Sequence, residues 1–257
     1  MLERIVSRNN NLIKSVAELR ESGARRREGL FCFEGVHLLE EAKRFGAELV
    51  YVFVREGSPG GYFALAAGSS ARVFEVTDAV YDRLTEEKAP QGVFAVARMP
   101  KNIRPLSESI PGGCAAVLCD IQDSGNVGTV IRTANAFNID AVILVGACAD
   151  LYNPKTVRAS MGAIFRQRVL TMSIQDLDEL TQQQALPLFG AALSDKAADL
   201  RNVEIHRAAV AIGSEGRGLS KELLSICGGE IIIPMNPESE SLNAAVAASV
   251  IMWEMSR

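Results

Sequence analysis

The sequence predicts an α/β protein of two units, of which the second is built on a parallel sheet. Apolar runs of strand length alternate with segments of helical period along most of the 257 residues. This alternation is typical of parallel sheets that helices cover on both faces. Pro100, Pro105 and Pro111 interrupt the pattern, and proline disfavours helix interiors and central strands. We therefore expect a first unit at residues 1–99, a linker at residues 100–112 and a second unit at residues 113–257.

The first unit is expected to be a small α/β domain. Apolar side chains near helical spacing predict one helix over residues 1–28. Short runs rich in β-branched and aromatic residues predict strands at residues 30–34, 49–54, 73–76 and 92–97. Amphipathic segments predict helices at residues 36–45, 62–67 and 78–84.

The second unit repeats the alternation with more strongly apolar strands. Strands are predicted at residues 115–119, 141–145, 168–172, 188–193, 208–212 and 230–233. Helices are predicted at residues 127–137, 154–160, 175–184, 220–225 and 242–255.

Composition limits the class of protein. The chain is 48% hydrophobic, so it can bury a large core, and no apolar run approaches the ~18 residues of a membrane span. The first residues have charges and no apolar core of a secretory signal. Five cysteines without a C-x-x-C pair predict buried, reduced thiols, and two histidines make a zinc site improbable. We expect a cytoplasmic protein without a metal.

Positive charge is concentrated in two segments of a chain whose net charge is −4. Residues 1–29 include Arg25, Arg26 and Arg27, and residues 151–168 carry Lys155 and Arg158 with no acid among them. These segments fit a polyanion bound in one place, or alternatively two solvated faces.

The most informative segment runs from Asp120 to Asn135, directly after the apolar run at residues 115–119. It opens an amphipathic helix, so its polar residues are expected at the carboxyl end of a strand, where α/β sheets bind ligands. Asn126 and Arg132 are unusual in a buried seam because both carry donors that need partners. A plain helix N-terminus with a surface arginine is the alternative.

A glycine-rich loop, Gly213 to Ser220, follows the apolar run at residues 208–212. Its glycines let the backbone approach a ligand closely. The order G-x-x-G-x-G is not the dinucleotide motif G-x-G-x-x-G, which speaks against a nucleotide-dependent oxidoreductase. Leu219 stands where a Walker loop needs lysine, and the Glu215 carboxylate would repel phosphates, so an NTPase is excluded.

A third segment, residues 231–247, joins a strand, a proline-containing loop and an alanine-rich helix. Ser241 stands where serine is commonly an N-cap. Asn243 is a poor helix former and is expected to have another purpose.

Together these segments resemble the SpoU, or TrmH-like, family of RNA 2′-O-ribose methyltransferases in the SPOUT superfamily. The matching motifs are N-x-G-x-x-x-R-T-A from Asn126, G-S-E-G-x-G-L-S from Gly213, and I-P-M followed by S-L-N-x-x-V-A from Ile233. Residues 33–42, 90–96 and 153–163 also resemble the family, so the similarity covers nearly the whole chain. Ser124 and Ser214 stand where the family often has proline and asparagine.

The resemblance implies a parallel sheet with a trefoil knot in the second unit, and an N-terminal domain that resembles ribosomal proteins and binds the RNA substrate. It also implies S-adenosylmethionine as cofactor and a homodimer formed through the knotted domain. The positions that correspond to cofactor contacts are Gly213, Ile233 and Leu242, with Leu193 and Met235 beside them.

The resemblance further implies in-line attack of a ribose 2′-hydroxyl on the sulfonium methyl group. It assigns the catalytic positions to Arg132, Asn126, Glu215, Ser241 and Asn243. Asn126 and Asn243 would orient the ribose and Arg132, and Glu215 would pair with a basic group or the loop backbone. Arg132 would act as a base helped by a phosphate, or hold that phosphate and stabilise the alkoxide. We favour the second role because guanidinium groups keep their protons.

The residues expected to contact RNA phosphates are Arg25, Arg26, Arg27, Lys155 and Arg158. The separate N-terminal domain favours 23S ribosomal RNA as the substrate. A tRNA 2′-O-methyltransferase, or a non-catalytic RNA-binding protein of the same fold, is the alternative.

Overall fold

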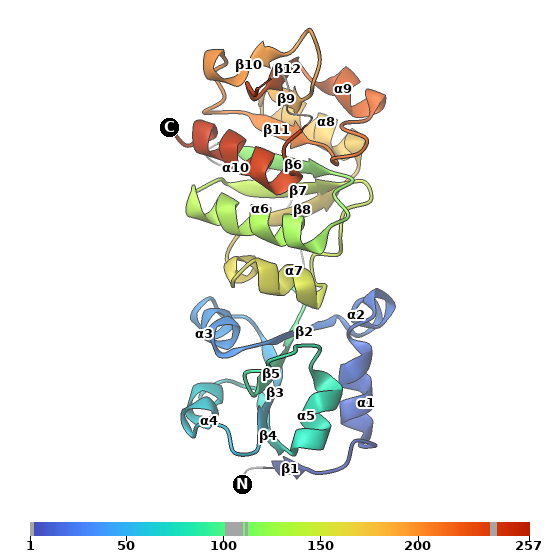
Figure 1. The fold of residues 1–257 in the computed structure, drawn as a ribbon, viewed down its shortest axis with the longest axis vertical. Helices are drawn as coiled ribbons and strands as arrows, with labels where there is room; N and C mark the ends of the chain where they lie inside the picture. The colour runs from blue at the N-terminus through green and yellow to red at the C-terminus, as the bar shows by residue number, and fades with distance from the viewer. Residues whose placement is uncertain (1–2, 101–109, 111–112, 237–240) are drawn as a thin grey trace. The chain divides into compact units, whose positions relative to one another are not determined.

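The computed structural model describes residues 3–100, 110, 113–236 and 241–257. The chain forms two compact units (Figure 1). One contains the described residues of Met1–Lys101 together with Asp150–Phe165, and the other those of Asn102–Ala149 and Arg166–Arg257. The expected boundaries differ from this division because Asp150–Phe165 packs with the N-terminal unit. Most of the expected linker lies outside the described residues.

The first unit has a five-stranded sheet in the order β1-β4-β3-β5-β2. Its strands are β1 (Glu3–Ile5), β2 (Leu30–Glu34), β3 (Leu49–Arg55), β4 (Arg72–Val76) and β5 (Val93–Arg98). Its helices are α1 (Asn11–Glu18), α2 (Ser22–Glu28), α3 (Val36–Arg44), α4 (Gly61–Ala66), α5 (Asp78–Leu84), α7 (Pro154–Ala159) and the 3₁₀ turn η2 (Ala163–Phe165). Strand β5 pairs antiparallel with β2 and β3, and the other pairs are parallel.

The prediction of a single helix over residues 1–28 is wrong. Glu3–Ile5 form β1, which pairs with β4, and Ile5 is buried in the core. The polar run before α1 separates β1 from that helix. The Asn10 side chain accepts the N–H of Leu12 and caps α1, so the helix begins there. Helix α2 ends at Gly29 in the left-handed conformation, with φ +64°. The helical period was present, but it belongs to two helices.

The second unit has a seven-stranded parallel sheet in the order β10-β12-β9-β11-β6-β7-β8. Its strands are β6 (Ala115–Cys119), β7 (Ala141–Val145), β8 (Val169–Met172), β9 (Leu188–Ala191), β10 (Ala198–Asp199), β11 (Ala209–Ile212) and β12 (Gly229–Ile232). Its helices are α6 (Ser124–Ala136), α8 (Ile174–Gln183), α9 (Lys221–Ile226), α10 (Ala244–Met255) and the 3₁₀ turn η3 (Leu200–Asn202). The parallel sheet is confirmed, whereas the sequence did not predict the short β10.

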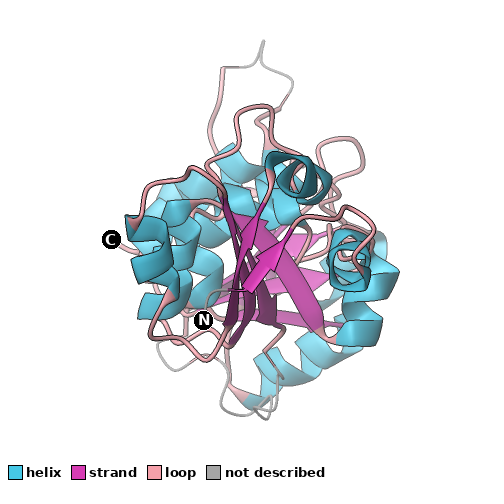
Figure 2. Cartoon of the chain, turned by 90° about the horizontal axis from the view of Figure 1, so that it is seen from below, coloured by secondary structure: helices cyan, strands magenta, loops and turns pink. Residues whose placement is uncertain are grey.

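Figure 2 shows helices on both sides of the strands, and helices pack on both faces of the seven-stranded sheet. Side chains of α8 and α9 pack against one face with alternate residues of β6, β7 and β11. Helices α6 and α10 lie side by side and pack against β7 and β11 (Figure 1). Strands β6 and β7 are buried along their whole length, as a doubly covered sheet requires.

Four adjacent strands, β12, β9, β11 and β6, end at the same edge because all of their pairings are parallel. Their following loops carry the three informative segments and the Leu193 segment. The sheet therefore brings together residues that are up to about 120 positions apart in sequence.

Candidate functional site

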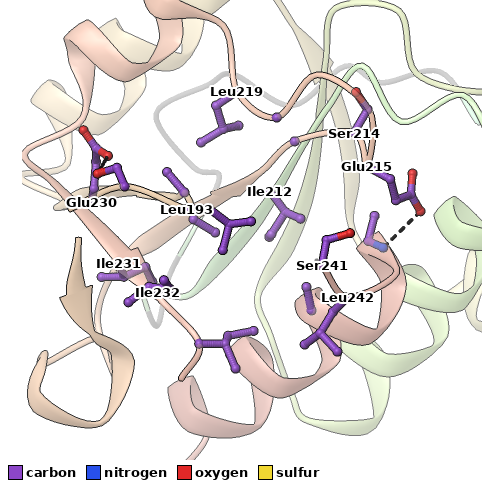
Figure 3. A pocket seen from close by; sticks show the side chains of 18 of the residues that line it. Leu193, Ile212, Ser214, Glu215, Leu219, Glu230, Ile231, Ile232, Ser241 and Leu242 are labelled. Carbon is purple, nitrogen blue, oxygen red and sulfur yellow. Dashed lines mark hydrogen bonds between the residues drawn. The ribbon is translucent and has the colours of Figure 1, made fainter. Parts of the chain in front are cut away.

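A cavity of about 410 Å³ lies at this edge of the sheet (Figure 3). The loops after β9, β11 and β12 and the start of α10 form its walls. All five residues predicted to contact the cofactor line the cavity: Leu193, Gly213, Ile233, Met235 and Leu242. The structure thus places these residues around one space, as the motifs predicted.

The walls are mainly apolar. Ile212, Leu219 and Ile231 lie between the polar ends of the cavity, and Ala244 and Ala247 leave room on the α10 side (Figure 3). Leu193 is 63% exposed, which places it at the rim. Walls of this kind suit a flat heteroaromatic ring and a thioether more than a polyphosphate.

The glycine-rich loop folds back on itself next to the cavity. The N–H of Gly218 donates to the carbonyl of Ser214 at 2.8 Å, and Gly218 has φ +64°. A Cβ atom on Gly213 would lie 2.6 Å from Leu219 N and closer still to the Gly218 carbonyl group. Gly213 is therefore required by close backbone approach within the loop.

Three side chains, one from each informative segment, form a hydrogen-bonded cluster beside the cavity. Asn126 Nδ2 donates to Glu215 Oε1 at 2.9 Å. Asn243 Nδ2 lies 3.1 Å from Asn126 Oδ1 and 3.2 Å from Glu215 Oε1, and the N–H of Ala244 donates to the same carboxylate oxygen at 3.1 Å. The motifs thus predicted residues that do meet, although they come from three separate loops.

Helix termini hold this cluster in place. Asp123 caps α6 by accepting the N–H of Asn126 at 2.7 Å. Asn243 is the N-cap of α10, where its Oδ1 accepts the N–H groups of Ala245 and Val246. The expectation that Ser241 could be this cap is wrong, because α10 begins two residues later than predicted. Ser241 lines the cavity instead.

The Glu215 carboxylate lies at the N-terminus of α10. Its bond from the Ala244 N–H uses one of the free donors at that end of the helix, and the helix dipole favours a negative charge there. The partners found for Glu215 are two asparagines and the Ala244 N–H of α10, whereas a basic group or the backbone of the glycine-rich loop was expected.

Arg132 lies apart from these groups. It is exposed on α6 and is not among the described residues that line the cavity. Six residues separate it from Asn126, which turns its side chain by about 120° around the helix axis. The structure of one chain therefore brings Asn126, Glu215, Ser241 and Asn243 to the site but not Arg132.

Four polar residues of the described cavity wall were not predicted as site residues: Ser194, Ser214, Arg217 and Glu230. Arg217 is the one cation among the described lining residues, and Ser194 and Glu230 form a hydrogen-bonded pair on the far side from Glu215. Arg217 lies within the glycine-rich motif, so the sequence could have indicated it as a site residue. Glu230 is a single acid in an apolar strand, and no motif or spacing in the sequence indicates that it belongs to the site.

Two cysteines of the second unit, Cys119 and Cys227, are fully and partly buried, respectively. Burial raises the pKa of the Cys227 thiol to about 11 and also raises the pKa of Cys119, so both thiols stay protonated at neutral pH. The described residues contain no group of three metal-ligating side chains. No helix in the described part of the chain is long and apolar enough to cross a membrane.

The residues expected to contact RNA lie in the first unit and differ in exposure. Arg25 is 2% exposed, pairs with Asp150 at 2.5 Å and donates to the carbonyls of Leu19 and Arg20. This arginine holds the first unit together and is not available to a phosphate. Lys155, Arg158, Arg26 and Arg27 are exposed, and Arg158 forms an ion pair with Glu87.

Comparisons with known proteins agree with this geometry. The SpoU rRNA Methylase family model matches residues 113–253, and an MRM3-like substrate binding domain model matches residues 10–95. The chain is 28% identical over 255 residues to the Bacillus subtilis 23S rRNA (guanosine(2553)-2′-O)-methyltransferase RlmP, with 99% of each chain covered. It is 32% identical to an uncharacterized tRNA/rRNA methyltransferase of Synechocystis, covering 98% of this chain and 93% of the relative.

Among solved structures, the AdoMet-bound rRNA methyltransferase from Sinorhizobium meliloti superposes with a TM-score of 0.89 at 26% identity. The superposition covers 99% of this chain and 97% of that one, so it includes both units. The family model alone spans more than half of the chain. The chain belongs to the SpoU rRNA Methylase family.

Proposed function

We propose that this protein transfers a methyl group from S-adenosylmethionine to a ribose 2′-hydroxyl of 23S ribosomal RNA. The observation that carries the proposal is the convergence of Asn126, Glu215 and Asn243 beside an apolar cavity of about 410 Å³. Relatives of nearly the same length are named as 23S rRNA 2′-O-methyltransferases, which supports the same reaction and substrate class.

The lining residues fit S-adenosylmethionine. The apolar walls suit its adenine and thioether portion, and the folded glycine loop lets backbone approach the ligand. Among the lining residues that the structure describes, the charged groups are Glu215, Glu230 and Arg217, so carboxylates outnumber cations there. A site with an excess of negative charge favours a ligand that carries a sulfonium cation. When bound, the cofactor supplies a methyl group on a good leaving group.

The residues of this chain then have to align the acceptor ribose and manage its proton. The bonds among Asn126, Glu215 and Asn243 fix these side chains before a substrate arrives, and Ser241 offers a hydroxyl at the cavity wall. We assign to Arg132 the stabilisation of charge on the attacking oxygen together with the adjacent phosphate, although within one chain Arg132 is not among the described residues that line the cavity. A guanidinium suits this role because it binds phosphate oxygens in a planar fork.

The first unit is proposed to hold the RNA. The substrate-binding model that matches residues 10–95 supports this assignment. Exposed Arg26, Arg27, Lys155 and Arg158 would contact phosphates and position the RNA without reading its sequence. Action on ribosomal RNA would place the enzyme in the cytoplasm.

This function is tested by mapping 2′-O-methylation in ribosomal and transfer RNA from a deletion strain and its parent, alongside calorimetric titration of the protein with S-adenosylmethionine. We expect one ribose of 23S rRNA to lose its methyl group and the protein to bind the cofactor. Loss of a tRNA methyl group would favour the tRNA alternative. Absence of cofactor binding would favour a non-catalytic RNA-binding protein.

We also propose that the second unit contains the trefoil knot. Residues 233–243 connect β12 to α10, and α10 packs against β11, two positions away from β12 in the sheet. A chain that leaves β12 and continues in a helix packed against β11 is compatible with threading, a rare topology on general grounds.

A homodimer through this unit is the proposed assembly. Helix α10 exposes Val246, Val250 and Trp253 at i, i+4 and i+7 spacing, with Trp253 55% exposed. The Phe137 ring at the end of α6 contacts Trp253 edge-on with centroids 5.5 Å apart, which extends this apolar stripe. An exposed apolar stripe of this kind is typical of a protein interface.

Replacing Trp253 with glutamate is expected to convert the dimer to a monomer, because a carboxylate in the apolar stripe would be buried without a partner. Light scattering during gel filtration measures the change in mass. Lys221→Glu provides the control, since Lys221 is exposed on α9, which packs on the other sheet face. A wild-type monomer, or an unchanged dimer in Trp253→Glu, would contradict the proposed assembly.

A further inference from the structure

An acidic residue lies in the cavity wall opposite the catalytic cluster. Glu230 is on β12 and lines the cavity on the side away from Glu215 (Figure 3). Ser194, in the loop after β9, donates its hydroxyl to Glu230 Oε2 at 2.6 Å. This bond does not use the second carboxylate oxygen of Glu230. The Ser194 hydroxyl also accepts the N–H of Lys196 at 3.2 Å, so one of its two lone pairs remains for a further donor.

The fold builds this pair before any ligand binds. Strands β9 and β12 are paired, with Glu230 opposite Gly190 in the register. The N–H of Ala192 donates to the carbonyl of Ile231 at 3.0 Å, which fixes the loop that carries Ser194 against β12. Glu230 and Ser194 are therefore held together by backbone pairing as well as by their own hydrogen bond.

The surroundings make a carboxylate here unusual. Ile231, Ile232 and Ile233 follow Glu230 in the same wall, and Ile231 is 1% exposed. A carboxylate that faces an apolar cavity is stabilised when it accepts hydrogen bonds. Its two oxygens can accept several hydrogen bonds, and a single hydroxyl donor supplies one of them. A ligand with hydrogen-bond donors at this end of the cavity would supply the remaining bonds.

We propose that Glu230 and Ser194 bind the 2′- and 3′-hydroxyls of the cofactor's own ribose, an inference that rests on the proposed function. The reacting methyl group must face the cluster of Asn126, Glu215 and Asn243, where the RNA ribose is oriented. The non-reacting part of the cofactor then lies towards the opposite wall. Two neighbouring hydroxyl donors match a carboxylate with an adjacent serine hydroxyl, and acidic side chains bind ribose hydroxyls in this way in nucleotide-binding α/β folds.

Calorimetry with three probes tests the assignment. S-adenosylmethionine, S-adenosylhomocysteine and 5′-methylthioadenosine share the adenosine portion. The second lacks the sulfonium charge, and the third lacks both the sulfonium and the amino-acid portion. The variants are Glu230→Gln, which preserves the shape of the side chain, and Ser194→Ala. Glu222→Gln is the matched control, because Glu222 is an exposed acid on α9 that bonds Gln175 and does not line the cavity.

Glu230→Gln is expected to weaken all three ligands by a similar factor of about ten, the size of one hydrogen bond to a charged group. Ser194→Ala should weaken all three by a smaller common factor, and Glu222→Gln should change none. The 2′,3′-dideoxy form of 5′-methylthioadenosine, which lacks both hydroxyls, should bind the wild-type protein weakly and lose no further affinity in Glu230→Gln.

Other outcomes would overturn the assignment. A loss confined to S-adenosylmethionine would mean that Glu230 interacts with the sulfonium. A loss that spares 5′-methylthioadenosine would mean that it binds the cofactor's ammonium group. Equal affinities in wild type and Glu230→Gln would mean that Glu230 binds no part of the ligand. If the wild-type protein binds none of the probes, the proposed function itself fails, so the two failures are distinguishable.

Discussion

Replacing Arg132 with alanine is expected to reduce methyl transfer by about a thousandfold or more while leaving the affinity for S-adenosylmethionine within about twofold of wild type. The rate should fall because the proposed guanidinium stabilises charge that develops on the attacking oxygen and binds the adjacent phosphate. The cofactor affinity should persist because Arg132 is exposed on α6 and is not one of the described residues that line the cavity.

Single-turnover methylation of rRNA measures the rate, and calorimetry measures the affinity. Arg132→Lys keeps the charge but not the planar fork, and is expected to recover a small part of the activity. Arg201→Ala serves as the control, since Arg201 is an exposed arginine of the same unit that pairs with Asp199. Wild-type turnover in Arg132→Ala would rule out the catalytic assignment.

The second large effect is expected from Gly213→Ala. The new methyl group would lie 2.6 Å from Leu219 N and closer to the Gly218 carbonyl group, so the loop has to open. Opening would move Glu215, which lies two residues further along and bonds both Asn126 and Asn243. Displacements of about 1 Å in such sites cost about a hundredfold in rate, and we expect a loss of at least that size in cofactor affinity as well.

Gly216→Ala is the matched comparison within the same loop. A Cβ atom at Gly216 would meet nothing within 4 Å, so this variant should bind the cofactor and methylate RNA like wild type. Calorimetry and the methylation assay on both variants, with a melting curve for each, separate a local effect from loss of fold. Equal affinities in the two variants would show that the tight loop is not needed for cofactor binding.

The accuracy of the fold prediction depended on how completely each element is buried. The bounds of β6 and β7 were predicted correctly because both are continuous apolar runs with an aspartate directly at one end and a glycine at or near the other. The N-terminal segment differs from the predicted single helix. Helical spacing continues across β1, α1 and α2, but Asn10 caps a new helix at α1. The two-residue strand β10 is too short to show any period.

The site was predicted where it depends on motifs and missed where it depends on tertiary packing. Asn126, Glu215 and Asn243 belong to recognisable motifs, and the parallel sheet brings their loops to one edge. Glu230 is a single acid before an isoleucine run, and only the pairing of β12 with β9 shows that it meets Ser194. Burial of Arg25 could not be read from a run of three arginines, because its partner Asp150 is 125 residues away.

That distant partner limits how the protein can be dissected. A fragment that stops at residue 100 would contain the whole five-stranded sheet but neither Asp150 nor helix α7. It would leave a guanidinium enclosed without its counter-ion, and it would uncover the rings of Phe31 and Phe33 where Tyr152 and Phe165 pack on them. Grafting the RNA-binding unit onto another protein would therefore require a second stretch of chain, taken from between two strands of the methyltransferase sheet.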